Sequence, residues 1–491
     1  MQRLSTANLG ALAPVIQQPT YNRAKVVPGI VHLGIGAFHR AHLAVYIEKL
    51  LPKTPQWAIV GASLRHPDTK NALTPQDGLY TVAVRDAGGT RCEVVGSIIG
   101  ILDARRERER LLSIMAHPAV KIVSLTVTEK GYCHDPATGR LDERHPDIVH
   151  DLADPAFPNS APGFIVAAIE RRRRDGVPPF AVMSCDNLPS NGKTASRIVT
   201  RFAELRSTEL GNYVLQNVAF PSTMVDRIVP ATTDTDRHQV SEIIGLEDAW
   251  PVVTEPFTQF VVEDNFPQGR PPFQDVGVQM VHDVEPFERM KLRMLNGSHS
   301  TLAYLGYLAG HKFVADAISA PGFGPFIRKM MTDEIIPTLS MPGVDLNAYR
   351  DALLARFANP ALKHRTWQIA MDGTQKLPQR LLGTIRDRLE RNQPISRLCL
   401  GVAGWMRYIT GVGEDRLPID VQDPMAQRLR TIADAARGEP VRLTVGLLTI
   451  AEVFGRDLPR NEIFRECVTA HLKSLYEHGA AETIANVVRA G

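Results

Sequence analysis

Between residues 30 and about 190, short runs rich in β-branched residues alternate with segments of helical periodicity. Strands are predicted at residues 30–34, 57–62, 120–127 and 180–185, and helices at residues 38–51, 107–116 and 166–175. Strands that are joined by helices of this length lie parallel in one sheet, because each helix carries the chain back across it. The runs 79–84 and 92–99 are separated only by a Gly-containing turn, which predicts an antiparallel insertion. The pattern restricts this part of the chain to a mainly parallel α/β sheet.

The rest of the chain has a different periodicity. Helical segments dominate residues 191–250, strand-like runs return at 250–262 and 276–281, and nearly everything after them is helical. A chain of 491 residues is also too long for one ordinary hydrophobic core. We therefore predict an α/β domain over residues 1–284 and a mostly α-helical domain over residues 285–491.

The composition is that of a globular protein, with 44% hydrophobic and 22% charged residues. A formal net charge of +3 gives no indication of a nucleic-acid or membrane partner. No apolar run reaches the roughly 20 residues of a membrane-spanning helix, and the polar residues after Arg3 are not typical of a signal peptide. The five cysteines are scattered and show neither a disulfide framework nor paired metal spacing. These features predict a cytoplasmic protein, and its size favours an enzyme.

A glycine-containing turn follows the first predicted strand and opens the first predicted helix. Its sequence is Gly34-Ile35-Gly36-Ala37-Phe38-His39-Arg40. Glycines at such a turn let the backbone approach a pyrophosphate, which the N-terminus of the helix stabilises. The usual fingerprint has glycine where this chain has His39, so an ordinary strand-to-helix turn is an equal alternative. His39 and His42 have no carboxylate or thiol nearby at matching spacing, which disfavours a metal site.

An acidic residue that binds the ribose of a dinucleotide is expected after the second strand. Asp68 is the only candidate, although it lies several residues beyond the end of that strand. It favours NAD as the cofactor. Arg65 could instead meet the 2′-phosphate of NADP, which makes NADP the less favoured choice.

Polar residues also follow the next strands of the predicted sheet. Glu129 comes after the strand that shows the clearest pattern, and Asn187 comes after the following one. Ligands of parallel sheets bind at these carboxyl ends. Asp186 and Asn187 could instead cap the helix that starts near residue 191. Asp226 and Arg227 stand together in an apolar segment, where a structural ion pair and a role in a site are equally reasonable.

Residues 286–308 predict a long helix with a proline in its first turn. At 100° per residue, Lys291 and His299 lie about 80° apart, and Asn296 lies within about 140° of Lys291. A lysine that is desolvated in a cleft has a lowered pKa and can act as a general base, and an amide can donate to a reacting oxygen. Singly, these residues could be an exposed lysine, a polar cap and a core histidine. Together they form a candidate catalytic face.

Several motifs, taken in order, resemble the mannitol dehydrogenase family of polyol-specific long-chain dehydrogenases. They are Gly34-x-Gly36-x-Phe38-His39-Arg40, Thr128-Glu-x-Gly-Tyr132, Ser184-Cys-Asp-Asn187, Met224-Val-Asp-Arg227, and Lys291 with Leu295-Asn-Gly-Ser-His299. The match extends over nearly the whole chain, and the histidine in place of a glycine is itself the pattern of that family. The resemblance implies a Rossmann-like domain followed by a helical domain. It also implies a metal-independent hydride transfer with NAD.

The resemblance further implies roles for individual residues. Lys291 would be the general base that takes the hydroxyl proton, while Asn187 and Asn296 would hold that oxygen. The residues that would orient the sugar chain or assist proton exchange are Asp226, His299 and Glu129.

Segments between residues 127 and 408 are most similar to the branch of the family that interconverts D-mannonate and D-fructuronate. Such a substrate carries a carboxylate that a polyol lacks, and a carboxylate favours a bidentate arginine or a lysine. The resemblance implies that Lys376 is shared with the polyol enzymes, whereas Arg380 is not. We therefore expect Arg380, together with Arg365, to bind the carboxylate.

Two alternatives remain open. A mannitol 2-dehydrogenase or a D-arabinitol dehydrogenase would oxidise a neutral polyol to a ketose with the same base. A non-catalytic nucleotide-binding protein would be expected to have lost Lys291, Asn187 or Asn296, which this chain retains. In the catalytic cases the partner is a small sugar acid or polyol, and the resemblance is compatible with a monomer or a small homo-oligomer.

Overall fold

The computed structural model describes residues 1–135 and 138–490. It divides into two units, Met1–Glu288 and Arg289–Gly491. The division falls within helix α11 (Glu285–Met290), whereas the sequence prediction places the boundary at residue 284. Among the described residues, no helix is long and apolar enough to cross a membrane.

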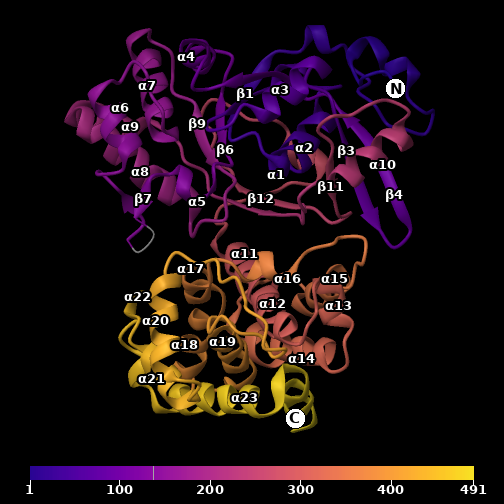
Figure 1. Cartoon of the computed structure of the whole chain (residues 1–491). Helices are drawn as coiled ribbons and strands as arrows, with labels where there is room; N and C mark the ends of the chain where they lie inside the picture. Colours follow the sequence, from indigo (N-terminus) through magenta and orange to yellow (C-terminus); the bar gives the residue numbers. More distant parts are fainter. Residues whose placement is uncertain (136–137, 491) are drawn as a thin grey trace. The chain divides into compact units, whose positions relative to one another are not determined.

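Five parallel strands form the main sheet of the first unit (Figure 1). They are β1 (Pro28–Leu33), β2 (Ala58–Ser63), β5 (Ile98–Asp103), β6 (Ile122–Leu125) and β9 (Ala181–Ser184), in the spatial order β5-β2-β1-β6-β9. Each neighbouring pair is parallel, which confirms the predicted sheet. The strand order runs in opposite directions on the two sides of β1. The gap between the ends of β1 and β6 is therefore the switch point at which ligands of such sheets bind.

The side chains of β1 alternate between two hydrophobic cores. Ile30 packs into a core that includes α2 (Leu43–Leu50). Val31 and Leu33 pack into a second core that includes α4 (Arg108–Ala116). Because helices cover both faces of the sheet, its strands are continuous apolar runs rather than alternating ones. This burial explains why the strands are recognisable in the sequence.

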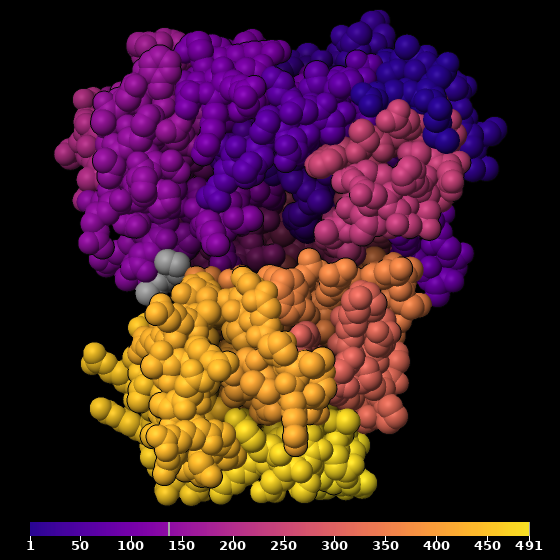
Figure 2. Space-filling model, in the orientation of Figure 1, coloured from indigo at the N-terminus to yellow at the C-terminus, as the bar shows by residue number. Residues whose placement is uncertain are grey.

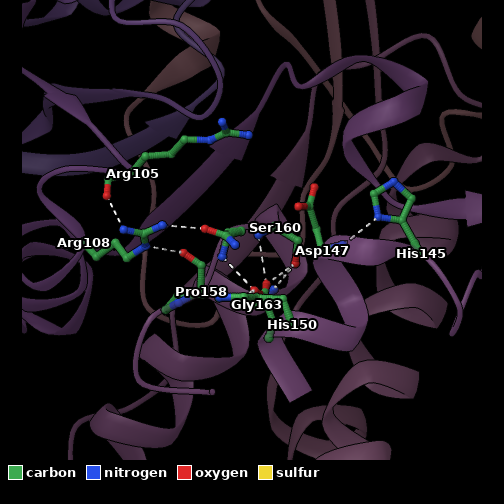
Figure 3. Close-up of polar contacts among 10 residues, drawn as sticks. Arg105, Arg108, His145, Asp147, His150, Pro158, Ser160 and Gly163 are labelled. Carbon is green, nitrogen blue, oxygen red and sulfur yellow. Dashed lines mark hydrogen bonds and ion pairs between the residues drawn. The ribbon is translucent and has the colours of Figure 1, made fainter. Parts of the chain in front are cut away.

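The crossover helix α7 (Ala161–Arg174) is fixed at its start by a buried carboxylate from α6 (Pro146–Ala153). Asp151 is 1% exposed and accepts hydrogen bonds from the backbone N–H and the Oγ of Ser160, at 2.9 and 2.6 Å. Ser160 Oγ then accepts from the N–H of Gly163 as the N-cap of α7 (3.0 Å; Figure 3). A Cβ at Gly163 would lie 2.1 Å from an Asp151 oxygen, so this close packing requires glycine.

Further helices and three smaller sheets complete the described part of the first unit. The remaining helices are α1 (Ala37–Ala41), α3 (Asp68–Leu73), α5 (Thr128–Gly131), α8 (Asn191–Arg206), α9 (Thr208–Asn217) and α10 (Asp234–Ile244). One sheet contains β11 (Val252–Thr254), β3 (Tyr80–Asp86) and β4 (Gly89–Val95), and a second contains β10 (Thr223–Asp226), β12 (Gln259–Glu263) and β13 (Gln279–Val281). The antiparallel pairing of β3 with β4 confirms the predicted insertion. A two-stranded ladder joins β7 (His134–Asp135) to β8 (Arg140–Leu141).

Three strand predictions differ from the structure. The run 92–99 is not one strand, because β4 ends before Gly96 and β5 begins after Ser97. There, Ser97 Oγ donates to the carbonyl of Ala44 on α2 (2.8 Å), and this contact holds the bend. The run 250–262 is likewise divided into β11 and β12. The strand β10 was missed, because four residues inside a helical stretch are too few to show a period of two.

The second unit is built from helices, as the sequence predicts (Figure 1). They are α12 (Gly297–Leu308), α13 (Val314–Ser319), α14 (Phe323–Lys329), α15 (Leu346–Phe357), α16 (Thr366–Ala370), α17 (Gly373–Leu377), α18 (Gly383–Glu390), α19 (Ser396–Tyr408), α20 (Ala426–Ala436), α21 (Pro440–Leu448), α22 (Ala451–Phe454) and α23 (Glu462–Ala490). The helices α12 and α19 are buried over most of their length and pack against each other. The helix α23, drawn in yellow in Figure 2, lies on the surface of this unit.

The long helix predicted over residues 286–308 contains a π-helical turn, η6 (Lys291–Asn296). The N–H of Gly297 donates to the carbonyl of Leu292, five residues back, so the spacing of 100° per residue does not apply there. The predicted angles between Lys291, Asn296 and His299 are therefore wrong. Beyond this turn, Gly297 lies against the carbonyl of Arg380, where a Cβ would be only 2.7 Å from the oxygen.

The loop after β1 touches the end of β6 through a glycine. Gly34 has a φ of +92°, and a Cβ there would lie 2.1 Å from the carbonyl oxygen of Thr126. Thr126 Oγ1 in turn donates to the carbonyl of Gly34 (2.7 Å). Only glycine fits this position, because a side chain would be both strained and in collision with the backbone. At Gly36 the nearest atom to a Cβ would be 3.8 Å away, so the second glycine is not required by packing.

We predict that Gly34→Ala lowers the free energy of unfolding by about 3 kcal/mol, because the added methyl group forces β1 and β6 apart. The matched control Gly36→Ala should change it by less than about 1 kcal/mol. Urea denaturation of both variants, followed by circular dichroism, measures the difference. Equal stabilities of the two variants would contradict the proposed contact.

Candidate active site

The loop between β1 and α1 presents its backbone at the switch point. Gly36 is the N-cap of α1. Among the described residues, a Cβ at Gly36 would meet only the Gly34 carbonyl oxygen, so the space beside the loop is open. Ile35 packs down on β2, where a Cβ at Gly61 would lie 2.3 Å from its Cδ1. The loop therefore fits a phosphate group that approaches its backbone, with Ala37 beginning the helix behind it.

His39 occupies the position at which the usual fingerprint has a glycine. Its side chain is accommodated there because the ring stacks on another ring. Its ring is 1% exposed and lies on the ring of His32 in β1, with centroids 3.4 Å apart. Nε2 of His32 faces Thr126 Oγ1 and Nδ1 faces Ser124 Oγ, both at 2.8 Å. Burial lowers the pKa of His32 to about 3 and that of His39 well below its usual value. Two neutral imidazoles thus hold α1 against the sheet, and His39 can meet a dinucleotide only through its backbone.

The helix predicted over residues 38–51 is wrong in one respect, because it is interrupted at His42. This residue separates α1 from α2 and has φ −123° and ψ −94°. Its Nε2 donates to the carbonyl of Gln259 on β12 (2.9 Å), and its ring stacks on that of Phe38 at 5.0 Å. These tertiary contacts outweigh the helical periodicity of the segment.

Arg40 and Asp68, both expected at the cofactor, lie in different environments. Arg40 is 4% exposed, donates to the carbonyl of Trp250, and lies 5.3 Å from the centroid of the Tyr80 ring. Burial lowers its pKa to about 10, so it stays charged at neutral pH. Asp68 is exposed as the first residue of α3. Arg40 therefore holds α1 in place, whereas Asp68 is accessible to a ligand.

Asp186 fixes the turn that carries Glu129. Its carboxylate accepts from the N–H groups of Val127 and Thr128, both at 3.0 Å, and from the hydroxyl of Tyr132 at 2.9 Å. Burial raises the pKa of Asp186 to about 6, and these hydrogen bonds oppose that rise. The suggestion that Asp186 caps the next helix is therefore wrong, since its side chain bonds to the segment after β6. Glu129 itself is exposed on α5.

Asn191, which the sequence analysis did not single out, links the loop after β9 to β10. Its Nδ2 donates to the carbonyls of Asp186 (3.0 Å) and Thr223 (2.9 Å). Its Oδ1 accepts from the N–H of Thr223 (2.9 Å). Asn187 is exposed in this loop, and Asp226 is 3% exposed at the end of β10. The segments that carry Asn187 and Asp226 are thus joined through Asn191.

Arg227, considered as an ion-pair partner of Asp226, donates to two carbonyl groups. These are the carbonyls of Ala41, at the end of α1, and of Glu255. Burial lowers the pKa of Arg227. Arg227 therefore ties the segment after β10 to α1, the helix that follows the loop after β1.

In the second unit, Lys291 and Asn296 stand at the two ends of η6. Lys291 is 7% exposed, and Asn296 is half-buried. Between them, Arg293 is held by the carboxylate of Asp387 (2.6 Å) and by Thr338 Oγ1 (2.8 Å). This anchorage fixes the π-helical turn, and with it the positions from which the lysine and the amide project.

Basic side chains converge around His299 on α12. The ring is 7% exposed, and its centroid lies 4.6 Å from that of Phe357 and 5.2 Å from that of His364. Its Nε2 has no hydrogen-bond partner among the residues that the structure describes. The pKa of His299 is well below its usual value, first because of burial and then because of His364, Arg380, Arg356 and Lys376. The sequence analysis did not identify Arg356, since nothing near it in the sequence distinguishes it from a surface arginine.

The three basic residues predicted to meet the substrate lie in different settings. Arg380 Nη1 donates to Oγ of Ser300, the neighbour of His299 (3.0 Å). Lys376 Nζ donates to the carbonyl of Ile369 (3.2 Å). Arg365 is exposed as the N-cap of α16.

One group of potential metal ligands occurs among the described residues. Ligand atoms of Cys133, His145 and Asp147 lie within 4.8 Å of one another. His145 Nδ1 accepts from the N–H of Asp147 as the N-cap of α6 (3.2 Å; Figure 3). Burial and the nearby Asp147 raise the pKa of the Cys133 thiol to about 12. Because the imidazole lone pair is engaged in this hydrogen bond, we assign no metal to this group.

Comparison with known families gives two matches that together cover most of the chain. Residues 28–275 match the mannitol dehydrogenase Rossmann domain. Residues 283–476 match the mannitol dehydrogenase C-terminal domain.

Individual relatives extend over nearly the whole length. D-mannonate oxidoreductase of Escherichia coli (strain K12) is 47% identical over 477 residues, which cover 96% of this chain and 98% of that protein. Mannitol 2-dehydrogenase of Aspergillus fumigatus (strain CBS 144.89 / FGSC A1163 / CEA10) is 42% identical over 498 residues, which cover 98% of each. The structure of Pseudomonas fluorescens mannitol 2-dehydrogenase in a ternary complex with NAD and D-mannitol matches with a TM-score of 0.91, 38% identity and 100% coverage of both chains.

Proposed function

The chain belongs to the mannitol dehydrogenase family of oxidoreductases, and we propose that it interconverts D-mannonate and D-fructuronate with NAD, as a D-mannonate oxidoreductase. The hydride transfer requires no metal in this proposal, and Lys291 is its general base. The observation that carries the choice of substrate is the group of basic side chains around His299.

The loop after β1 fits the diphosphate of NAD. Gly34 keeps the backbone close to β6, and the open side of Gly36 leaves room for the phosphates. Asp68 follows β2 and is exposed at the start of α3. In this proposal it accepts from the ribose hydroxyls and repels a 2′-phosphate. When bound, NAD supplies the acceptor for the hydride that leaves the carbinol carbon of the substrate.

Side chains of the protein carry out the proton transfer in this proposal. In the oxidation, Lys291 Nζ accepts the proton of the substrate hydroxyl. Asn187 and Asn296 donate amide hydrogens to the same oxygen and stabilise the charge that develops on it. In the reverse direction the same amides polarise the carbonyl group, and the lysine returns the proton. Asp226 and His299 orient the sugar chain.

Glu129 exchanges protons with solvent in this proposal. It is exposed on α5, next to the backbone N–H groups that Asp186 holds. An exposed carboxylate on a fixed turn can relay a proton without being part of the bond-making step.

A sugar acid fits the surroundings of His299 better than a neutral polyol does. Because His299 and His364 are held neutral by burial, the positive charge comes from the other three groups, which are Arg356, Lys376 and Arg380. A substrate carboxylate offsets that charge, and a guanidinium binds it with two charge-assisted hydrogen bonds. We assign this contact to Arg380, while an assisting role for the exposed Arg365 stays a prediction.

The polyol alternative is supported by the similarity to mannitol 2-dehydrogenases. Initial rates with D-mannonate, D-mannitol and D-arabinitol, each with NAD and with NADP, separate the possibilities. We predict that kcat/KM for D-mannonate with NAD exceeds every other combination by at least about 100-fold, which corresponds to about 2.7 kcal/mol. A higher value for a polyol would make the protein a mannitol or arabinitol dehydrogenase. Nucleotide binding without turnover would identify a non-catalytic protein.

We predict that Lys291→Ala lowers kcat by about 10³-fold, because the proton of the hydroxyl then has no acceptor. The thermal unfolding temperature and the dissociation constant for NADH should stay close to those of the wild type. Lys363→Ala, at an exposed lysine of the same unit, is the matched control and should keep full turnover. Normal turnover of the Lys291 variant would overturn the mechanism.

We predict that Arg380→Ala raises KM for D-mannonate by about 10- to 100-fold, since a charge-assisted contact of roughly 1.5–3 kcal/mol is lost. Turnover of D-mannitol should change by less than about threefold if this contact is specific for the carboxylate. Ser300→Ala removes the Arg380–Ser300 hydrogen bond but keeps the charge, so it should affect the two substrates equally. A loss that Arg380→Ala shares equally between mannonate and mannitol would contradict the carboxylate assignment.

A further inference from the structure

Two cysteines of the second unit meet on neighbouring helices. Cys399 lies on α19 and Cys467 lies on α23, and these helices pack against each other. The contact between Ser396 and His471, one turn away on each helix, places the two thiols side by side, and each thiol shifts the pKa of the other. Cys399 is fully buried, whereas Cys467 is half-buried on a helix at the surface of the unit (Figure 2). A small reagent therefore reaches the pair from the Cys467 side.

A histidine completes this group. His471 lies one turn beyond Cys467 on α23, at the i+4 position where side chains on a helix meet. It forms a hydrogen bond with Cys467, and its Nε2 lies 3.1 Å from Oγ of Ser396 at the start of α19. The imidazole is thus held between the two helices by a partner on each.

The two thiols differ in their protonation. The neighbouring Cys399 and His471 side chains lower the pKa of Cys467 below its usual value, against the opposing effect of burial. Burial and the bond to Cys467 raise the pKa of Cys399 well above its usual value. Of the two thiols, the half-buried Cys467 is therefore the more readily ionised, and the buried Cys399 stands beside it as the protonated partner. Redox-reactive cysteines have this arrangement, in which a thiolate stands beside a second cysteine that can resolve it.

We propose that Cys467 is a hydroperoxide-reactive cysteine and that Cys399 is its resolving partner, so that oxidation joins α19 to α23 by a disulfide. In the first step the Cys467 thiolate attacks one oxygen of hydrogen peroxide. An S–O bond forms, the O–O bond breaks, and hydroxide leaves as the sulfur is oxidised to a sulfenic acid. In the second step the Cys399 sulfur attacks the Cys467 sulfur, its proton neutralises the departing hydroxide, and an S–S bond forms. The pair loses two electrons. The peroxide becomes one water and one hydroxide, and solvent protonates the hydroxide released in the first step.

This site is independent of the sugar substrate. It rests on α19 and α23 alone, and thiol chemistry can be followed without any turnover assay. The remaining cysteines, which are Cys92, Cys133 and Cys185, are buried in the first unit, and burial raises the pKa of each thiol. They serve as internal controls in the same molecule.

The test uses the reduced full-length protein and hydrogen peroxide, with the products mapped by peptide mass spectrometry. We expect a Cys399–Cys467 disulfide that dithiothreitol reverses, while the three cysteines of the first unit remain reduced. Closing the pair should raise the thermal unfolding temperature by several degrees. Failure to form this disulfide in folded protein, or oxidation of Cys467 only between two molecules, would refute the proposal.

Variants separate the roles of the residues. Cys399→Ser should stop at a sulfenic acid on Cys467, which dimedone captures. His471→Gln should slow alkylation of Cys467 by iodoacetamide at pH 7 by about tenfold, because a smaller fraction is then thiolate. Cys92→Ser is the matched control and should form the disulfide at the wild-type rate. An unchanged alkylation rate in His471→Gln, or no dimedone adduct in Cys399→Ser, would count against the assigned roles.

Discussion

The first unit depends on how closely the ends of three neighbouring strands approach one another. Gly34 has no Cβ, so its backbone can lie against the carbonyl of Thr126, whose hydroxyl bonds back to it. Asp186, just beyond β9, accepts from the backbone that follows β6. The loops after β1, β6 and β9 therefore form one hydrogen-bonded group. The positions of Glu129 and Asn187 follow from it, because each lies in one of these loops.

A comparable constraint acts inside the second unit, where the turn η6 packs on a second π-helical turn, η9 (Pro378–Leu382). Gly297 permits the contact, since any side chain there would meet the carbonyl of Arg380. A π-helical turn holds one residue more than an α-helical turn, so it changes the direction in which later side chains point. Lys291 and Arg380 each lie in one of these turns. Their geometry is set by backbone packing and not by the regular helices on either side.

The sequence predicted the parallel sheet and the helical second domain, because both produce repeated patterns over many residues. Strands covered on both faces appear as unbroken apolar runs, and long helices show their own period. It did not predict η6, since six residues with a different hydrogen-bond spacing leave no periodic signal. The stacking of His39 on His32 and the direction of the Asp186 carboxylate were also missed. Both are contacts between segments that are distant in the sequence, and such contacts cannot be predicted from the order of the residues alone.

Arg356 is another residue whose position could not be predicted from the sequence. It also indicates how substrate specificity can arise in such a fold. It reaches the surroundings of His299 from α15, while Lys376 comes from α17 and Arg380 from η9. Arginine and lysine stay protonated at the pH values at which a sugar acid is ionised, so their attraction for a carboxylate is nearly independent of pH in the neutral range. In the proposed reaction, proton uptake by Lys291 is a separate event on a separate turn. Binding of the acid and removal of its hydroxyl proton can therefore respond differently to pH, and a few charged side chains can select the substrate without altering the chemistry.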